Sequence, residues 1–286
     1  MKKNILKYPV KVLMYAVLIL LAVITVFPVL YSFFGALKDN MELLTSDKLL
    51  PSKVIFDNYI YAWGKVKFAR YTFNSIFVSG VTVLLSVIIA SMGGYALARK
   101  NFPGRRLIHT LYIWSMFLAV GSATLYPVYK LCIDLKMNST LAGIIFVGVG
   151  PQVYNIILVE GFVKGVSRGY DEAAKIDGCG FFMIYAKIIL PLIRPVLGVI
   201  SLFVFVASWN SYLIPMILTA GRPELKTLAV GIVEMKSNGE MATLWSVILA
   251  GANIAVVPIV IVYLFANNSL YRDLRSAVLK NNFLKG

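Results

Sequence analysis

Residues 71–98 read YTFNSIFVSGVTVLLSVIIASMGGYALA, and this stretch contains no Asp, Glu, Lys or Arg. A helix needs about 20 mostly apolar residues to cross the roughly 30 Å hydrocarbon core of a membrane. Membrane strands would be about ten residues long and would alternate strictly between apolar and polar side chains, a pattern that this stretch lacks. It therefore predicts a membrane-spanning helix.

Five further stretches of similar length are also free of charged residues. One long apolar run could be a buried core helix of a soluble protein, but six such runs in one chain favour a membrane protein. With short flanks, the predicted spans are 12–37, 71–98, 107–129, 137–163, 193–221 and 241–271. We therefore expect an all-α, polytopic membrane protein whose six transmembrane helices form one domain over residues 12–271.

The composition agrees with this interpretation. The chain of 286 residues is 59% hydrophobic and only 14% charged, whereas soluble domains average about 45–50% apolar and about 25% charged residues. A soluble globule with this composition would expose more apolar surface than soluble proteins usually do. The net charge of +15 could by itself indicate a nucleic-acid partner, so its position along the chain decides what it means.

Basic residues concentrate on one side of the predicted membrane. If the N-terminal residues 1–11 are cytoplasmic, 17 of the 28 Lys and Arg residues but only four of the 13 acids lie in cytoplasmic segments, as the positive-inside rule requires. We therefore expect both termini in the cytoplasm, with 272–286 as a cytoplasmic tail. The charge then reports orientation, and no nucleic-acid partner is expected.

Motifs for catalysis are missing from the sequence. It contains no G-x-x-x-x-G-K-[ST] phosphate-binding loop, no G-x-S-x-G and no H-E-x-x-H. The single histidine, His109, and the two cysteines, Cys132 and Cys179, are too far apart in the predicted topology for a zinc site or a disulfide. Ionisable residues, which ion-driven carriers commonly place deep in their spans, are scarce there. We therefore expect no catalytic residue, metal or cofactor in this chain, and an energy source in another subunit.

The connection between the fourth and fifth spans is the most informative segment. Residues 161–195 read GFVKGVSRGYDEAAKIDGCGFFMIYAKIILPLIRP, which predicts a helix, a turn and a second helix. Asp171 and Glu172 suit the first turn of the first helix. Gly178 suits a left-handed residue that ends this helix, and Pro191 interrupts the second helix. On these grounds alone, an ordinary interfacial helix is an alternative.

The same segment resembles the EAA loop of ATP-binding-cassette importer permeases, whose pattern E-A-A-x-x-x-G-x(9)-I-x-L-P is matched at every defined position. In that family the loop, here residues 164–191, forms a short coupling helix that docks on a cytoplasmic ATPase subunit. The resemblance also implies two partner ATPase subunits that bind ATP and Mg²⁺, and an extracytoplasmic solute-binding protein. It implies ATPase-coupling roles for Glu172, Ala173, Ala174, Asp177, Gly178, Ile188, Leu190 and Pro191.

Three further segments resemble sugar permeases of the maltose type. GGYALAR at 93–99 and FPGRR at 102–106 are close to the pattern A-Y-A-L-A-R-x-x-F-x-G-R. SWNSY at 208–212 is similar to S-W-N-D/E-F, with Ser211 in place of the usual acid, and 274–280 loosely resembles the usual ending. The resemblance implies a smaller permease subunit of a bacterial-type plasma (inner) membrane, which pairs with a larger, related permease in a heterodimer. It also implies that the imported solute is a carbohydrate, an oligosaccharide by analogy with the family.

Polar and aromatic residues in the spans are candidates for the substrate path, because sugars need hydrogen-bonding groups and aromatic faces. Each such residue could instead join neighbouring helices. The charge-free stretches within the spans contain no cation, which favours a neutral saccharide over a strongly anionic solute. Uronate oligosaccharides, glycerol-phosphate and amino acids stay open as substrates, as does an autonomous secondary carrier. The candidates are Gln152, Tyr154, Asn155, Trp209, Asn210, Ser211, Tyr212, Asn74 and Tyr126.

Overall fold

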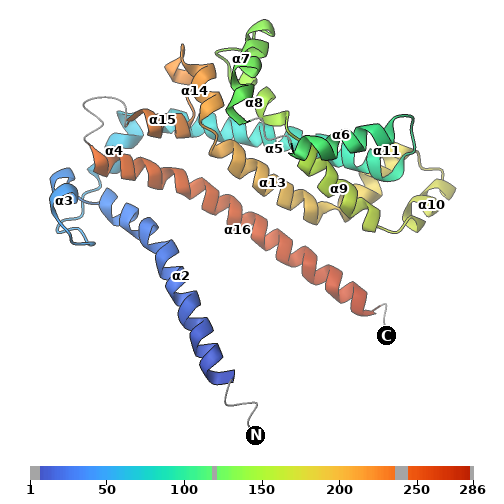
Figure 1. The fold of residues 1–286 in the computed structure, drawn as a ribbon, viewed down its shortest axis with the longest axis horizontal. Coiled ribbons are helices and arrows are strands. Elements are labelled where there is room, and N and C mark those ends of the chain that lie inside the picture. Colours follow the sequence, from blue (N-terminus) through green and yellow to red (C-terminus); the bar gives the residue numbers. More distant parts are fainter. Residues whose placement is uncertain (1–6, 118–120, 236–243, 284–286) are drawn as a thin grey trace. The chain divides into compact units, whose positions relative to one another are not determined.

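The computed structural model describes residues 7–117, 121–235 and 244–283, and within these ranges every regular element is a helix (Figure 1). The all-α prediction is therefore confirmed for the part of the chain that is described. The elements are α2 (Lys7–Ala36), α3 (Asn40–Thr45), α4 (Asp57–Gly64), α5 (Phe68–Arg99), α6 (Arg105–Phe117), η1 (Gly121–Thr124), α7 (Leu125–Asp134), α8 (Leu141–Val149), α9 (Val153–Gly165), α10 (Gly169–Ile176), α11 (Phe181–Ile184), η2 (Tyr185–Ile189), α12 (Leu190–Leu192), α13 (Arg194–Trp209), α14 (Leu213–Thr219), η3 (Pro223–Leu225), α15 (Leu228–Met235) and α16 (Trp245–Phe283).

Three helical segments are long and apolar enough to cross a membrane, namely Lys11–Ala36, Phe68–Arg99 and Trp245–Leu264. Two further spans are possible if each of two bent helix pairs counts as one. α8 and α9 meet at an angle of 48°, and the helix that ends at α12 meets α13 at 77°. The described residues therefore give three to five spans, and the number six stays a prediction.

The predicted third span, 107–129, differs most from a single straight helix. α6 ends at Phe117, and a short 3₁₀ turn and the ten-residue α7 follow, while 118–120 lie outside the described residues. A stretch without charged residues can face lipid, but it does not have to form one uninterrupted helix. Similarly, 241–243 of the predicted sixth span lie outside the described part, and α16 continues to Phe283.

Contacts divide the chain into two compact units, and the first comprises Met1–Ala69 and Gly231–Val257. Its helices are tied by side-chain amides. Asn58 donates hydrogen bonds of 2.8 Å to the carbonyl oxygens of both Ala36 and Lys38. Asn253 of α16 donates to the Ser32 carbonyl and to the Tyr59 hydroxyl, both at 3.1 Å. These bonds hold the end of α2, α4 and the start of α16 together.

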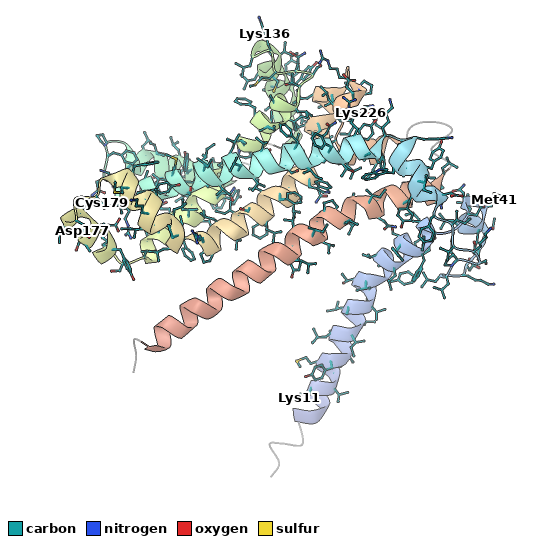
Figure 2. The ribbon with its side chains drawn as sticks, turned by 180° about the vertical axis from the view of Figure 1, so that it is seen from behind. Lys11, Met41, Lys136, Asp177, Cys179 and Lys226 are labelled. Carbon is teal, nitrogen blue, oxygen red and sulfur yellow. The ribbon has the colours of Figure 1, made fainter. Side chains whose placement is uncertain are left out.

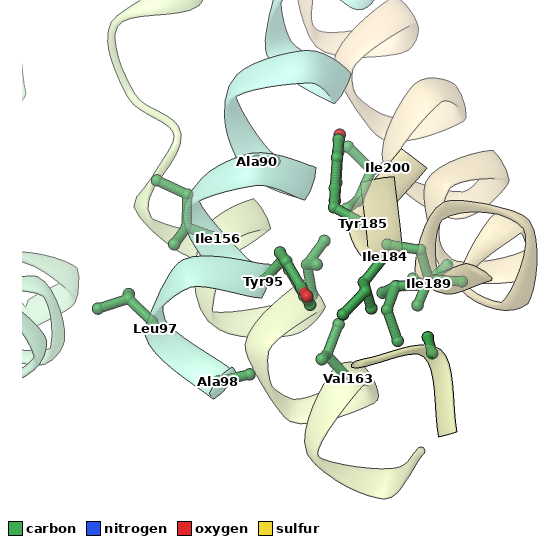
Figure 3. Close-up of a cluster of buried hydrophobic side chains, with 14 residues drawn as sticks. Ala90, Tyr95, Leu97, Ala98, Ile156, Val163, Ile184, Tyr185, Ile189 and Ile200 are labelled. Carbon is green, nitrogen blue, oxygen red and sulfur yellow. The ribbon is translucent and has the colours of Figure 1, made fainter. Parts of the chain in front are cut away.

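The second unit comprises Arg70–Val230 and Pro258–Gly286. In it α9 packs against α6 and α13, and α14 packs against α7 and α8. Its largest apolar cluster joins α5, α9 and the segment from α10 to α13 (Figure 3). Ile189, Ile193 and Ile200 are completely buried there. This cluster positions the predicted coupling loop.

Close contact between α5 and α9 depends on Gly94. A Cβ atom added at Gly94 would lie 2.6 Å from Cβ and Cγ1 of Val159 and 2.9 Å from the backbone nitrogen of Glu160. Real Cβ atoms do not approach other atoms so closely. Only a residue without a side chain allows the two helix backbones to approach each other this closely.

We expect Gly94→Ala to destabilise the protein, because the added methyl group must push α5 and α9 apart, at a cost of about 1–3 kcal/mol. The measurement is the thermal unfolding midpoint of the purified transporter in detergent. Gly80→Ala is the matched control, since a Cβ at Gly80 of the same helix meets nothing within 4 Å. Equal midpoints for the two variants would contradict the close approach.

Candidate functional site

The predicted coupling loop contains a helix, a turn and a second helix, as the sequence indicates. α10 ends at Ile176, and Gly178 follows with a φ of +80°, so the prediction of a left-handed residue there is confirmed. Figure 2 shows Asp177 and Cys179 at this turn. The chain then enters α11, a π-helical turn (η2) and α12, which contains Pro191.

A buried ion pair attaches α10 to the end of α5. Nε of Arg99 lies 3.1 Å from Oδ2 of Asp171, and the two side chains are only 7% and 10% exposed. Arg99 also donates a 2.7 Å hydrogen bond from Nη2 to the carbonyl oxygen of Val166, just before α10. A buried charge is tolerated only when it is paired and hydrogen-bonded, so Arg99 and Asp171 fix the position of the short helix.

Aromatic contacts attach the second helix to the same end of α5. The ring of Tyr95 stacks on Phe181, with centroids 4.6 Å apart. Its centroid lies 5.4 Å from that of Tyr185, and Figure 3 shows both tyrosines in the buried cluster. The hydroxyl groups of Tyr185 and Ser91 are 2.7 Å apart and share a hydrogen bond. Nζ of Lys100 lies over the ring of Phe181, 4.6 Å from its centroid. Both helices of the loop are therefore held by residues 91–100.

The outer face of the loop is exposed. An open cavity of about 620 Å³ is lined by Ser167, Gly169, Tyr170, Ala173, Ala174, Asp177, Cys179 and Ile188. It brings together four of the eight predicted coupling residues. Glu172 is exposed and lines a different cavity, of about 230 Å³, with Tyr95 and Arg99. Gly178 and Pro191 are exposed, and Leu190 is half-buried.

The sequence analysis did not identify two large apolar residues of α10 as candidate site residues. Ile176 is 87% exposed and Tyr170 is 54% exposed, although both lie outside the predicted spans. Large apolar side chains that project from a polar helix are a signal for a contact with another chain. In the sequence these two residues lie on either side of Asp171, Glu172 and Lys175, and this pattern could have indicated an exposed contact surface.

A second charged cluster joins α6 and α9. Glu160 is buried, and its two carboxylate oxygens lie 3.1 Å from Nε2 of His109 and 2.8 Å from Nζ of Lys164. Glu160 lies near the end of the predicted fourth span, 137–163, and His109 is its partner from α6. In the described residues no group of three His, Cys, Asp or Glu side chains is arranged to hold a metal ion.

A cavity that combines apolar walls with a few polar groups lies where α8 and α9 are broken. Its volume is about 430 Å³, and α5, α8, α9, α13 and α14 contribute its walls. Three of the predicted path residues, Gln152, Asn155 and Ser211, line it together. The full lining is Thr82, Ile144, Val147, Gly148, Pro151, Gln152, Asn155, Phe203, Val204, Ala207, Ser208, Ser211 and Ile214.

The other predicted path residues do not line this cavity. Asn74 donates to the carbonyl oxygens of Glu224 and Lys226, both at 2.9 Å, and thereby holds the turn at η3. Trp209 is buried, with its ring stacked on Phe205 at 5.5 Å. The remaining four lie elsewhere: Tyr154, which donates to the Met116 carbonyl, Tyr126 and Asn210 are exposed, and Tyr212 is half-buried.

These features define an all-helical membrane protein with a rigidly held, exposed short helix and a cavity at a helix break. Residues 90–276 match the family model "Binding-protein-dependent transport system inner membrane component", and the chain belongs to this family. It is a permease subunit of an ATP-binding-cassette importer, which is a multi-pass inner-membrane protein and works with ATPase and solute-binding partners.

Similar proteins support the same assignment. The chain is 28% identical over 250 residues to the diacetylchitobiose uptake system permease protein NgcG of Streptomyces coelicolor, covering 87% of this chain and 82% of the relative. It is 28% identical to the arabinooligosaccharides transport system permease protein AraQ of Bacillus subtilis, covering 86% and 87%. A crystal structure of a bacterial ABC transporter that imports the acidic polysaccharide alginate matches with a TM-score of 0.78 at 25% identity, covering 90% of this chain and 95% of that one.

We expect Arg99→Gln to destabilise the loop by about 3–5 kcal/mol, because it leaves the buried Asp171 carboxylate without its counter-charge. The double variant with Asp171→Asn should lose less than the sum of the two single variants, because the two residues are in contact. Thermal unfolding of the purified transporter measures both effects. Arg106→Gln, at an exposed cation on α6, is the control. Strict additivity of the two changes would contradict a direct pair.

Proposed function

We propose that this permease subunit translocates a neutral carbohydrate, an oligosaccharide, that an extracytoplasmic binding protein delivers. ATP and Mg²⁺ are bound by the partner ATPase subunits. The single observation that carries the substrate proposal is the cavity of about 430 Å³, whose mostly apolar walls carry amide and hydroxyl groups and no charged side chain. Sites of this size commonly hold small molecules through a few placed polar groups on mostly apolar walls.

The names of related permeases support a saccharide. They include permeases for diacetylchitobiose, arabinooligosaccharides, starch degradation products and trehalose. An acidic oligosaccharide is the second candidate, because the structural neighbour imports alginate. A uronate would favour Arg or Lys beside the carboxylate, and the cavity of this chain offers neither. Such a cation would have to come from the second permease.

The loop at 164–191 is proposed to dock on an ATPase subunit. Glu172, Ala173 and Asp177 are exposed and present charge and a small residue, while Tyr170 and Ile176 add apolar surface. Interfaces of this kind combine a few buried apolar anchors with charged groups at the rim. Closure of the ATPase pair would move the docked helix, and the rigid attachment to α5 would pass that movement to the spans.

The assembly and orientation complete the proposal. The chain pairs with a second, related permease in a heterodimer, two ATPase subunits lie in the cytoplasm, and both termini of this chain are cytoplasmic. The concentration of Lys and Arg in 1–11, 99–106, 160–194 and 272–286 supports this orientation. It places the exposed face of α10 on the side where ATP is available.

The substrate is tested with the complete importer in proteoliposomes, supplied with its binding protein and ATP. Diacetylchitobiose, arabinotriose, maltotriose and trehalose are compared with oligoalginate of similar length. We expect at least one neutral saccharide to stimulate ATP hydrolysis and to accumulate inside, with oligoalginate at the basal level, because the cavity offers no cation for a uronate. Stimulation by oligoalginate alone would favour the acidic candidate, and stimulation by amino acids alone would reject a saccharide importer.

The docking role is tested with Glu172→Lys. Reversing a charge at an interface costs several kcal/mol, and 1.4 kcal/mol is tenfold, so ATP-driven uptake should fall by at least about tenfold. Insertion and expression should be normal, because Glu172 is exposed. Co-purification of the ATPase measures docking directly. Lys187→Glu, an equal charge reversal at another exposed position of the loop, is the control, and full uptake by Glu172→Lys would contradict the docking role.

A further inference from the structure

A row of hydroxyl groups follows one face of α5. Thr72, Ser75, Ser79, Thr82 and Ser86 are spaced by three and four residues alternately, which places them on one side of a helix. All five are buried, with at most 9% of each residue exposed. A buried stripe of hydroxyls in an apolar spanning helix is costly unless each hydroxyl has a partner.

Two members of this row have an evident structural task. Ser75 accepts a 2.8 Å hydrogen bond from the backbone nitrogen of Leu228 and so holds the start of α15. Ser86 accepts a 2.8 Å bond from Nε2 of Gln152. Thr82 has no such task. It is 1% exposed, its Oγ1 has no hydrogen-bond partner within the described residues, and it lines the cavity of about 430 Å³.

The amides on the opposite wall are fixed by a chain of hydrogen bonds. Nδ2 of Asn155 donates to Oε1 of Gln152 at 2.8 Å, and Nε2 of Gln152 donates to Ser86. Because Ser86 is completely buried and Gln152 is 4% exposed, this chain is shielded from solvent. It fixes which end of each amide is used, and it leaves Oδ1 of Asn155 as an acceptor at the cavity wall.

Space and an aromatic face complete the cavity. Gly148 lies opposite Thr82, and a Cβ atom there would come within 3.2 Å of Cγ2 of Thr82, so the glycine keeps the space beside the hydroxyl open. Phe203 lines the same cavity and is 64% exposed. The walls therefore offer one free hydroxyl, one acceptor and one aromatic face.

We propose that this cavity is a binding site for one hydroxyl-bearing ring of the transported solute, in which Thr82 hydrogen-bonds a solute hydroxyl and Asn155 accepts from another. Ser86 is a positioning residue that orients Asn155 through Gln152. The proposal rests on the proposed carbohydrate substrate and adds the residues that contact it in this subunit. Phe203 offers its ring to the C–H face of the sugar.

Its position at the cavity distinguishes Thr82 from the other buried hydroxyls. Thr72, Ser79 and Thr227 also lack a hydrogen-bond partner within the described residues, but they do not line this cavity. Other buried or half-buried hydroxyls are satisfied locally. Thr219 donates to the Pro215 carbonyl at 2.7 Å, and Ser201 donates to the Leu197 carbonyl at 2.8 Å. An unsatisfied buried polar atom is rare in native proteins and calls for a specific partner. For Thr82 that partner is a hydroxyl of the solute.

The test compares Thr82→Val, which keeps the shape and removes the hydroxyl, with Thr82→Ser, which keeps the hydroxyl. The importer is reconstituted in proteoliposomes with saturating, loaded binding protein, and uptake is measured for diacetylchitobiose, arabinotriose, maltotriose and trehalose. Loss of one hydrogen bond predicts about two- to tenfold slower uptake in Thr82→Val, restored by Thr82→Ser. Thr219→Val is the matched control and should transport normally.

Monodeoxy analogues of the transported saccharide separate contact from structure. If Thr82 bonds one hydroxyl, Thr82→Val should slow the parent saccharide but not the analogue that lacks that hydroxyl. The binding protein's own preference among saccharides cancels, since the same binding protein supplies the wild-type and the Thr82→Val importer. An equal loss for the parent and every analogue, or unchanged uptake in Thr82→Val, would overturn this proposal while leaving the proposed function intact. A wild-type importer that transports no saccharide would overturn both. Ser86→Ala should weaken uptake less than Thr82→Val, and Ser86→Thr should restore it.

Discussion

The buried ion pair between Arg99 and Asp171 is the contact on which the organisation of the second unit depends. It removes two charges from water, and it is tolerated because each charge faces the other and Arg99 also bonds the Val166 carbonyl. The pair fixes α10 to the last residue of α5, and Tyr95 fixes the following helix one turn earlier. α5 is continuous from Phe68 to Arg99. Thr82 lies 17 residues before Arg99, which in a helix is about 25 Å. One continuous helix thus joins the exposed face that we propose for docking to the wall of the cavity at the helix break.

Charge near the loop follows the same logic. Glu160 is buried, yet His109 from α6 and Lys164 from its own helix each face one carboxylate oxygen. With Gly94 allowing α5 to approach α9 at this level, three helices meet around paired charges and small residues, as expected where helices pack without a hydrophobic drive from water. The end of the bundle that carries the coupling loop is therefore stiff. A short helix can transmit movement only if its attachment to the neighbouring helix does not deform first. These contacts make the attachment rigid.

The sequence predicted the helical class, the loop and its left-handed glycine because these depend on local features: apolar length, an acidic first turn and Gly178. It could not predict where long apolar runs break, because the run 137–163 satisfies lipid whether or not α8 and α9 form one straight helix. For the cavity, Gln152 and Asn155 were accessible to sequence reasoning because they are three residues apart and share a helix face. Asn74 and Trp209 are likewise polar or aromatic residues of predicted spans. In the folded chain, however, Asn74 hydrogen-bonds the turn at η3, and Trp209 is buried. Arg99 and Asp171 could not be paired, since 72 residues separate them.

The helix break and the hydroxyl row on α5 explain each other. Pro151 has no N–H group and interrupts the hydrogen-bond ladder between α8 and α9, where Gly150 and Gln152 make only short-range backbone bonds. Freed backbone groups at membrane depth are tolerated only where they are buried in protein or line a polar cavity. Such a cavity needs a facing wall that offers hydrogen bonds without charge. Thr82 lines this wall, and Ser86, one turn further along α5, accepts a hydrogen bond from Gln152 at the break. A solute that brings its own hydroxyls satisfies both walls at once. Discontinuous helices mark binding sites in several transporter folds for this reason. Here the break lies at the start of α9, the helix that continues toward the loop at 164–191, so the proposed solute site and the proposed docking surface lie on connected elements.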